Sequence, residues 1–291
     1  MLIIPTLSIS TPVRSRLAPT PSGFLHAGNA FGFVLTWQLV RKHRGTLHLR
    51  IDDLDTARVR PAYVADIFDT LDWLGVDYDS GPRNAEEFAQ RYSQRHRLPG
   101  YETTLDQLRK TGLVYACDCS RARVLATSTN NLYAGTCRDK RLNLDQPGVA
   151  WRVRVPEDTH VTFEDGMSGP QRIRLDRVMG DFVVRRRDGI PAYQIASLTD
   201  DLHDNVNLVV RGADLLPSTA AQLFLATHLP ANPFPQTIFC HHPLLTDAEG
   251  RKLSKSAGAK ALRTLRGEGP SPADLFGQWT GTLGYAPRRN D

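Results

Sequence analysis

A glycine- and proline-rich turn with a single histidine leads into a helix-like segment near the N-terminus. The sequence is PTPSGFLHAGNAFGFVLTWQLV at residues 19–40. Apolar residues recur there at helical spacing, which predicts a helix that begins just after Gly28. Such a turn lets the backbone approach a ligand closely, and a helix N-terminus offers amide groups to phosphate. The segment lacks the G-x-G-x-x-G dinucleotide fingerprint, so the interpretation depends on His26.

A second candidate segment, KLSKS, stands at residues 252–256 between Gly250 and Gly258. Its two lysines are point charges that could close over a triphosphate and offset the charge that builds on a departing pyrophosphate. Taken singly, a lone histidine is more often structural, and a basic loop is often only solvated. Taken together on a parallel α/β scaffold, His26 and KLSKS indicate ATP binding and nucleotidyl transfer.

The elements that must position these residues alternate between strand and helix. We expect a strand at 14–19, a helix to about His43 and a strand at 46–51, an order typical of a parallel sheet. A second amphipathic helix ends at Leu74, where Gly75 stands at the C-cap position. From about 115 to 187, cysteines and short β-like pieces interrupt this pattern. The alternation resumes afterwards with a strand at 207–212, a helix at 217–229, a strand at 236–245 and a small helix at 275–283.

The composition is that of an ordinary globular protein, with 41% hydrophobic and 23% charged residues in 291. There is no apolar run of about 18 residues and no secretory signal pattern, so we expect no membrane segment and a cytoplasmic location. The net charge is +5, and several arginines gather in one region: Arg172, Arg174, Arg177, Arg185, Arg186 and Arg187. They could bind a polyanion, or they could form a solvated face.

The segments HAGN and KLSKS resemble the HIGH and KMSKS signatures of class I aminoacyl-tRNA synthetases. Longer segments resemble the glutamyl branch: RLAPTPSGFLHAGNA is similar to R-F-A-P-S-P-[ST]-G-x-L-H-x-G, and LRIDDLDTAR to R-I-E-D-x-D-x-x-R. RRRDGIPAYQIASLTDD and VVRGADLL correspond to later active-site segments. The similarity extends from Arg14 to Ser256. It implies an α/β fold, a Rossmann-like class I catalytic domain with a parallel sheet.

The same resemblance assigns roles to individual residues. It implies that His26 and Lys255 are catalytic, and that ATP is held by these two together with Gly28, Asn29 and Lys252. The glutamate-binding residues it implies are Arg16, Ala18, Thr20, Asp52, Tyr193 and Arg211. Arginines suit the substrate's carboxylates, Asp52 suits its ammonium group, and Tyr193 can donate a hydrogen bond. Asp52 departs from the pattern, because the family has the longer glutamate there.

Three of the four cysteines are clustered in sequence, at Cys117, Cys119 and Cys137. In the expected reducing compartment such a cluster indicates a metal before a disulfide, although free thiols remain an alternative and a closed tetrahedral site needs a fourth ligand. Short paralogues of glutamyl-tRNA synthetase carry C-x-C…Y-x-x-x-C, and this chain matches that pattern. The resemblance implies Tyr133 as the fourth ligand of a structural zinc ion.

Residues 257–291 are too few for the large helical anticodon-binding region of full-length glutamyl-tRNA synthetases, so the chain resembles the truncated paralogues. These activate glutamate with ATP without tRNA, with Mg²⁺ expected, and transfer it to the queuosine base in the anticodon of tRNA(Asp). We expect a monomer that does not bind membranes. The expected domains are a first catalytic half at 1–114, a zinc-bearing insertion at 115–190, a second catalytic half at 191–265 and a short tail at 266–291.

Three other functions remain open from the sequence. A minimal glutamyl-tRNA synthetase would charge the 3′ end of tRNA(Glu). A nucleotidyl transferase without an RNA partner could use the same turn, although the glutamate-site match and the cysteine-bearing insertion count against it. A catalytically silent binding module would need decayed signatures, yet His26, Lys255, Tyr193 and Arg211 are intact and only Asp52 supports this alternative.

Overall fold

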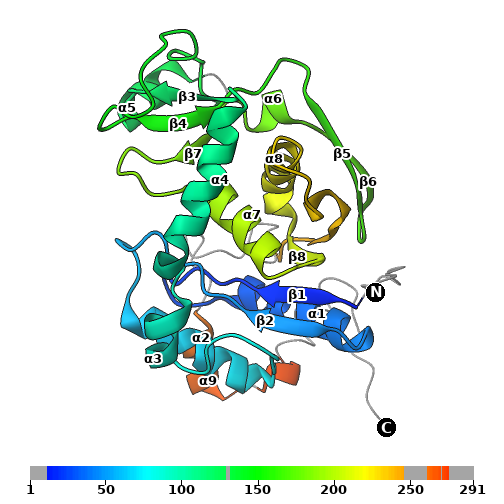
Figure 1. Cartoon of the computed structure of the whole chain (residues 1–291). Coiled ribbons are helices and arrows are strands. Elements are labelled where there is room, and N and C mark those ends of the chain that lie inside the picture. The colour runs from blue at the N-terminus through cyan, green and yellow to red at the C-terminus, as the bar shows by residue number, and fades with distance from the viewer. Residues whose placement is uncertain (1–11, 129–131, 246–260, 270, 275–291) are drawn as a thin grey trace. The chain divides into compact units, whose positions relative to one another are not determined.

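The computed structural model describes residues 12–128, 132–245, 261–269 and 271–274 (Figure 1). The chain divides into two compact units. The first comprises Met1–His96, Leu208–Asp214 and Phe239–Asp291, and the second Arg97–Asn207 and Leu215–Ile238. No helix in the described ranges is both long and apolar enough to cross a membrane. The expected domain boundaries at 115, 190 and 265 stay predictions.

The first unit is built on two parallel strands, β1 (Arg14–Leu17) and β2 (Thr46–Leu49), drawn in blue in Figure 1 and joined by helix α1 (Ala27–Lys42). The pairing continues beyond the strands, because the Arg50 amide donates to the Leu17 carbonyl and the Asp52 amide to the Pro19 carbonyl, both at 2.9 Å. The parallel strand–helix–strand unit predicted from the sequence is therefore confirmed, and its carboxyl edge carries residues 18–20 beside Asp52.

The first unit contains further elements besides β1, α1 and β2. They are α2 (Pro61–Leu74), α3 (Ala85–Glu87), η1 (Phe88–Tyr92), β8 (Leu208–Gly212), β9 (Ile238–His242) and α9 (Leu262–Glu268). The Ser15 hydroxyl donates to the Leu208 carbonyl at 2.8 Å, which fixes β8 beside β1. As predicted, α2 ends at Gly75, whose φ of 65° is the left-handed conformation that glycine adopts without strain.

The second unit carries the cysteines on a small antiparallel sheet, ordered β3-β4-β7. Its strands are β3 (Val114–Cys117), β4 (Ala150–Val153) and β7 (Val183–Arg185). A hairpin of β5 (His160–Asp165) and β6 (Gly169–Arg174) follows β4. The helices are η2 (Gln94–Arg97, which straddles the boundary), α4 (Leu98–Lys110), α5 (Arg121–Thr127), α6 (Leu175–Val178), α7 (Tyr193–His203), α8 (Leu216–Ala226) and η4 (Phe234–Gln236).

Helix α7 packs against α4 and α8, and these contacts form much of the core of the second unit. Tyr101 of α4 is fully buried, as are Leu198 of α7 and Leu225 of α8. The sequence predicted α8, but α4 and α7 were not expected. The small helix expected at 275–283 lies outside the described residues.

Candidate active site and cysteine cluster

His26 caps the N-terminus of α1 with its own ring. Its backbone is extended, with φ −128° and ψ 173°, and the ring Nδ1 accepts the Gly28 amide at 3.1 Å. In return, the Asn29 Oδ1 accepts the His26 amide at 3.1 Å, which completes a reciprocal capping box. Because Nδ1 accepts a hydrogen bond, the neutral ring carries its proton on Nε2. The cap therefore fixes which ring nitrogen can donate.

The described chain resumes after residues 246–260 in contact with this same turn. Ala261 forms an antiparallel bridge with His26, and the Leu262 amide donates to the Leu25 carbonyl at 2.8 Å. Lys252 and Lys255 lie outside the described residues. The residues that follow KLSKS in the chain are thus anchored on the turn that holds His26.

Four of the implied glutamate-binding residues lie on the β1–β2 edge. Arg16 is in β1 and is only 4% exposed, Ala18 and Thr20 follow it, and Asp52 is 8% exposed beside them. Ligands of parallel α/β sheets bind at this carboxyl edge. The structure therefore brings these residues together.

Arg211 lies on β8, the strand fixed beside β1. It is buried, and its guanidinium stands 5.7 Å from the centre of the Phe239 ring. Tyr193 belongs to the second unit, where it is the first residue of α7 and is 41% exposed.

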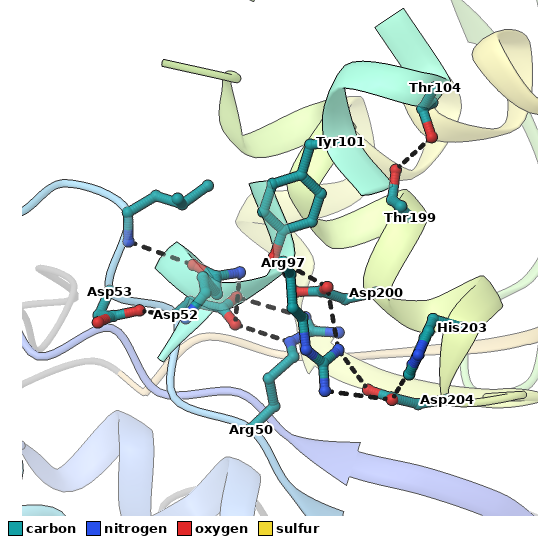
Figure 2. Close-up of polar contacts among 12 residues, drawn as sticks. Arg50, Asp52, Asp53, Arg97, Tyr101, Thr104, Thr199, Asp200, His203 and Asp204 are labelled. Carbon is teal, nitrogen blue, oxygen red and sulfur yellow. Dashed lines mark hydrogen bonds and ion pairs between the residues drawn. The ribbon is translucent and has the colours of Figure 1, made fainter. Parts of the chain in front are cut away.

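Asp52 is paired with an arginine of its own segment, as Figure 2 shows. The Arg50 Nε lies 2.7 Å from Asp52 Oδ1, and Nη2 lies 3.3 Å from Oδ2. The side-chain amide of Gln94 also donates, through Nε2, to Asp52 Oδ1 at 3.3 Å. Both charged side chains are nearly inaccessible, at 2% and 9% exposure. A substrate ammonium would therefore meet a carboxylate whose position Arg50 and Gln94 already fix.

Asp53 is a buried acid that the sequence reasoning missed. It accepts hydrogen bonds from the Ser93 hydroxyl at 2.6 Å and from the Gln94 backbone amide at 2.8 Å. Burial raises the pKa of Asp53, although these hydrogen bonds act in the opposite direction. The adjacent acids in RIDD could have drawn attention to it, whereas no sequence signal points to Ser93 and Gln94.

A buried ion-pair network holds helix α7, which begins with Tyr193 (Figure 2). Arg97 contacts Asp200 at 3.0 Å and Asp204 at 3.1 Å, and the Tyr101 hydroxyl donates to Asp200 at 2.9 Å. The Asp200 side chain is 1% exposed, so removing Arg97 would take the ion-pair partner away from a buried carboxylate, which is costly. These contacts fix the position of α7 within its unit.

The three clustered cysteines converge in the second unit. Cys117, Cys119 and Cys137 are buried, and their sulfur atoms lie within 4.8 Å of one another. The Tyr133 hydroxyl lies 3.4 Å from the Cys117 sulfur and 3.6 Å from that of Cys119, and it accepts the Cys137 amide at 2.9 Å. Thiolate sulfurs at this spacing fit a single soft ion. The fourth cysteine, Cys240, is buried in β9.

Charged groups surround the cysteine cluster. The Arg152 guanidinium stands 3.9 Å from the centre of the Tyr133 ring, and Cys137 Sγ donates to the Asp118 carboxylate at 3.0 Å. Burial opposes ionisation of Cys117, yet its hydrogen bonds with Tyr133 and Arg152 outweigh burial and lower the pKa of that thiol. These contacts within the protein are enough to orient the thiols.

Asp181 connects the loop that carries Cys137 to the small sheet. Arg138 binds both of its oxygens, at 2.8 and 2.6 Å, while the Tyr115 hydroxyl and the Val155 amide also donate to it. Burial would raise the pKa of Asp181, but these bonds prevail and lower it. The acid is therefore ionised and multiply bonded.

The arginine group does not form one uniform basic patch. Arg174 pairs with Asp176 at 2.9 Å, Arg186 with Asp188 at 2.7 Å, and Arg187 donates to the Gly148 carbonyl at 2.6 Å. Neighbouring acids thus offset part of the charge. This favours the solvated-face interpretation for those arginines.

The sequence model of the catalytic domain of class I tRNA synthetases (E and Q) matches residues 12–289. The chain belongs to this family. This class I synthetase is 38% identical over 288 residues to the Glutamyl-Q tRNA(Asp) synthetase of Nitratidesulfovibrio vulgaris, covering 94% of this chain and 87% of that one. It is 39% identical over 269 residues to the protein of the same name from Burkholderia cenocepacia, covering 89% and 85%.

Among solved structures, the class I synthetase resembles glutamate-tRNA synthetase from Elizabethkingia anophelis, with a TM-score of 0.76 and 25% identity. The match covers 97% of this chain and 63% of that chain, so the present chain spans less than two thirds of that structure's length. The family resemblance and the class I catalytic fold expected from the sequence are confirmed, and the protein is an enzyme of the ligase type.

Proposed function

We propose that this class I synthetase activates glutamate with ATP and transfers it to the queuosine base of tRNA(Asp). The carboxylate of glutamate attacks the α-phosphorus of ATP, the bond to the β-phosphate breaks, and pyrophosphate leaves. A hydroxyl group of the queuosine base then attacks the activated carbonyl, and AMP leaves. The names of the relatives in N. vulgaris and B. cenocepacia support the choice of acceptor.

The observation that carries the ATP half of the proposal is the capped turn at His26. The cap directs the ring proton to Nε2, where it can meet a phosphate oxygen. Gly28 and Asn29, whose amides are bonded to His26 itself, would line the phosphate site at the start of the helix. Lys255 would stabilise the leaving pyrophosphate and Lys252 would assist it, with Mg²⁺ accompanying ATP. The bridge between Ala261 and His26 supports this, because it anchors the chain six residues after Lys255 on this turn.

Glutamate would bind at the edge of β1 and β2. Arg16 and Arg211 would take its carboxylates, because a planar guanidinium matches a carboxylate in two-point contact. Asp52 would take the ammonium group, Tyr193 would donate a hydrogen bond, and Ala18 and Thr20 would line the site. The burial of Arg16 and Asp52 supports these roles, since charge interactions are stronger away from water.

We also propose that Cys117, Cys119, Cys137 and Tyr133 hold a structural zinc ion in a zinc-bearing insertion. The convergence of three buried sulfurs and the phenol oxygen supports the fit. A closed four-ligand site has no open position for a substrate, so the ion would stabilise the loop and take no part in adenylation. We place the enzyme in the cytoplasm as a monomer, where ATP and tRNA are available.

A second relative supports another acceptor: the chain is also 37% identical over 280 residues to Glutamate--tRNA ligase 2 of Syntrophus aciditrophicus, covering 92% of this chain and 56% of that one. The alternative is that the enzyme charges the 3′ end of tRNA(Glu). The test supplies labelled glutamate, ATP and queuosine-containing tRNA(Asp) that lacks its 3′-terminal adenosine. The same RNA without queuosine and intact tRNA(Glu) are the matched controls.

Label on the queuosine-containing RNA alone supports the proposal. Label on tRNA(Glu) alone supports the alternative. Pyrophosphate exchange without label on either RNA would refute both acceptors while leaving glutamate activation intact.

A further inference from the structure

Asp66 of α2 reaches the turn that precedes His26. Its Oδ2 accepts the Leu25 amide at 3.0 Å, and the two residues are 3% and 2% exposed. A buried carboxylate is tolerated only when it is well bonded. This bond therefore fixes the backbone immediately before the capping histidine.

The other oxygen of Asp66 holds helix α9. Arg266 Nη2 donates to Asp66 Oδ1 at 2.8 Å, and its Nη1 donates to the Thr70 hydroxyl at 2.6 Å. The side chains of Arg266 and Asp66 are 15% and 2% exposed, so this pair is shielded from water and from screening by salt. One carboxylate thus joins the turn to α9.

A backbone hydrogen bond also joins the turn before His26 to the start of α9. The Leu25 carbonyl accepts the Leu262 amide at 2.8 Å, so both polar groups of Leu25 are engaged, one by α2 and one by the start of α9. On the outer side, the Arg263 guanidinium stands 5.1 Å from the centre of the Phe24 ring. The position of His26 therefore depends on contacts to two helices that are distant from it in sequence.

We propose that Asp66 and Arg266 are positioning residues for adenylation. They hold Leu25, and through it His26 and the start of α1, in register with the chain that follows the KLSKS segment. The inference rests on the proposed function, because it assumes that ATP phosphates bind at this turn. Misplacement of a phosphate-binding group by about 1 Å can reduce a rate by about 100-fold. Asp66 and Arg266 therefore affect the rate of adenylation without contacting the substrate.

The test measures glutamate-dependent ATP–pyrophosphate exchange in Arg266→Ala, Arg266→Lys and Asp66→Asn. We expect Arg266→Ala to lower kcat by about 10- to 100-fold and to raise the KM for ATP, while the KM for glutamate stays unchanged. Arg266→Lys keeps a positive charge beside the Asp66 carboxylate. Its kcat and its KM for ATP should therefore lie between those of Arg266→Ala and the wild type. Asp66→Asn retains an acceptor for the Leu25 amide and should be intermediate.

Arg41→Ala is the matched control. Arg41 lies at the other end of α1 and pairs with Asp77 and Asp79 at 2.6 and 2.9 Å. Its loss should lower stability but leave both KM values and kcat unchanged. A variant that merely contains less folded protein would lower kcat with both KM values intact, which is distinct from the expected pattern.

Amide hydrogen exchange gives a readout that does not depend on activity. Faster exchange of the Leu25 and Leu262 amides in Arg266→Ala, with Arg41→Ala unchanged, supports the inference. An active wild type whose Arg266→Ala variant keeps wild-type kinetics overturns this inference alone. A wild type without pyrophosphate exchange overturns the proposed function, and the positioning role with it.

Discussion

The two nitrogens of the His26 ring offer a way to separate capping from catalysis. Nδ1 accepts the Gly28 amide at 3.1 Å, so the neutral ring carries its proton on Nε2. The amide group of asparagine occupies the place of Nδ1, and that of glutamine reaches the place of Nε2. His26→Asn should keep the cap and lose the donor, whereas His26→Gln should do the reverse. His26→Ala loses both.

The size of each effect follows from the loss of one hydrogen bond, either the one that caps α1 or the one to the substrate. Loss of a helix cap costs about 1 kcal/mol, which for a protein of this size lowers Tm by about 2–4 °C. Loss of one preorganised donor to developing charge costs about 2.7–4 kcal/mol, or about 100- to 1000-fold in kcat. His26→Asn should therefore melt like the wild type and be as inactive as His26→Ala. His26→Gln should melt a few degrees lower and keep measurable activity.

Two assays on the same preparations decide this, thermal unfolding and glutamate-dependent ATP–pyrophosphate exchange. If His26→Asn exchanged pyrophosphate within about threefold of the wild type, a difference well below that expected for a lost catalytic donor, His26 would be only a helix cap. The catalytic role of His26 would then be refuted.

Three further predictions concern separate parts of the molecule. Because its bonds lower the pKa of Asp181, this acid stabilises the fold above its unfolded pKa of about 3.9, and the contribution is lost as pH falls through the lower folded value. Asp181→Asn should thus lower the free energy of unfolding by about 3 kcal/mol at pH 7. In urea unfolding, the difference in this free energy between the variant and the wild type should become smaller below about pH 4. Elemental analysis of the freshly purified wild type should find near-stoichiometric zinc, and Cys137→Ser should lose most of it; a metal-free wild type would contradict the proposed ligands. Asp52→Asn should raise the KM for glutamate by about 10- to 100-fold and leave the KM for ATP unchanged, with Asp55→Asn as the control; equal KM values in both variants would exclude Asp52 from ammonium binding.

The elements that the sequence predicts well are those whose pattern is local. Phe31, Leu35 and Leu39 recur at helical spacing and lie on the buried side of α1, and the alternation of Leu47 and Leu49 matches a buried strand. The HAGN turn could be placed at a helix start for the same reason. Helix α4 was missed because proline and glycine at its beginning and polar residues along it obscure the pattern.

Contacts between residues far apart in sequence could not be predicted in this way. Asp66 and Arg266 are separated by 200 positions, and neither residue type carries a motif. The pairing of Arg50 with Asp52 is local, but the second contact of Asp52, with the side chain of Gln94, joins residues 42 positions apart. Such choices are made by tertiary packing, on which composition and periodicity give no information.

The bonds of Asp181 have a consequence for how a metal ion would bind. Because Arg138 adjoins Cys137 and is held by both oxygens of Asp181, the loop is ordered by contacts that need no ion. Fixing a residue's backbone costs about 1–2 kcal/mol of conformational entropy. In this loop the backbone is fixed when the chain folds, so metal binding does not have to order it. An incoming ion would displace thiol protons but would order little additional chain, so its release should weaken this region without unfolding the rest of the molecule.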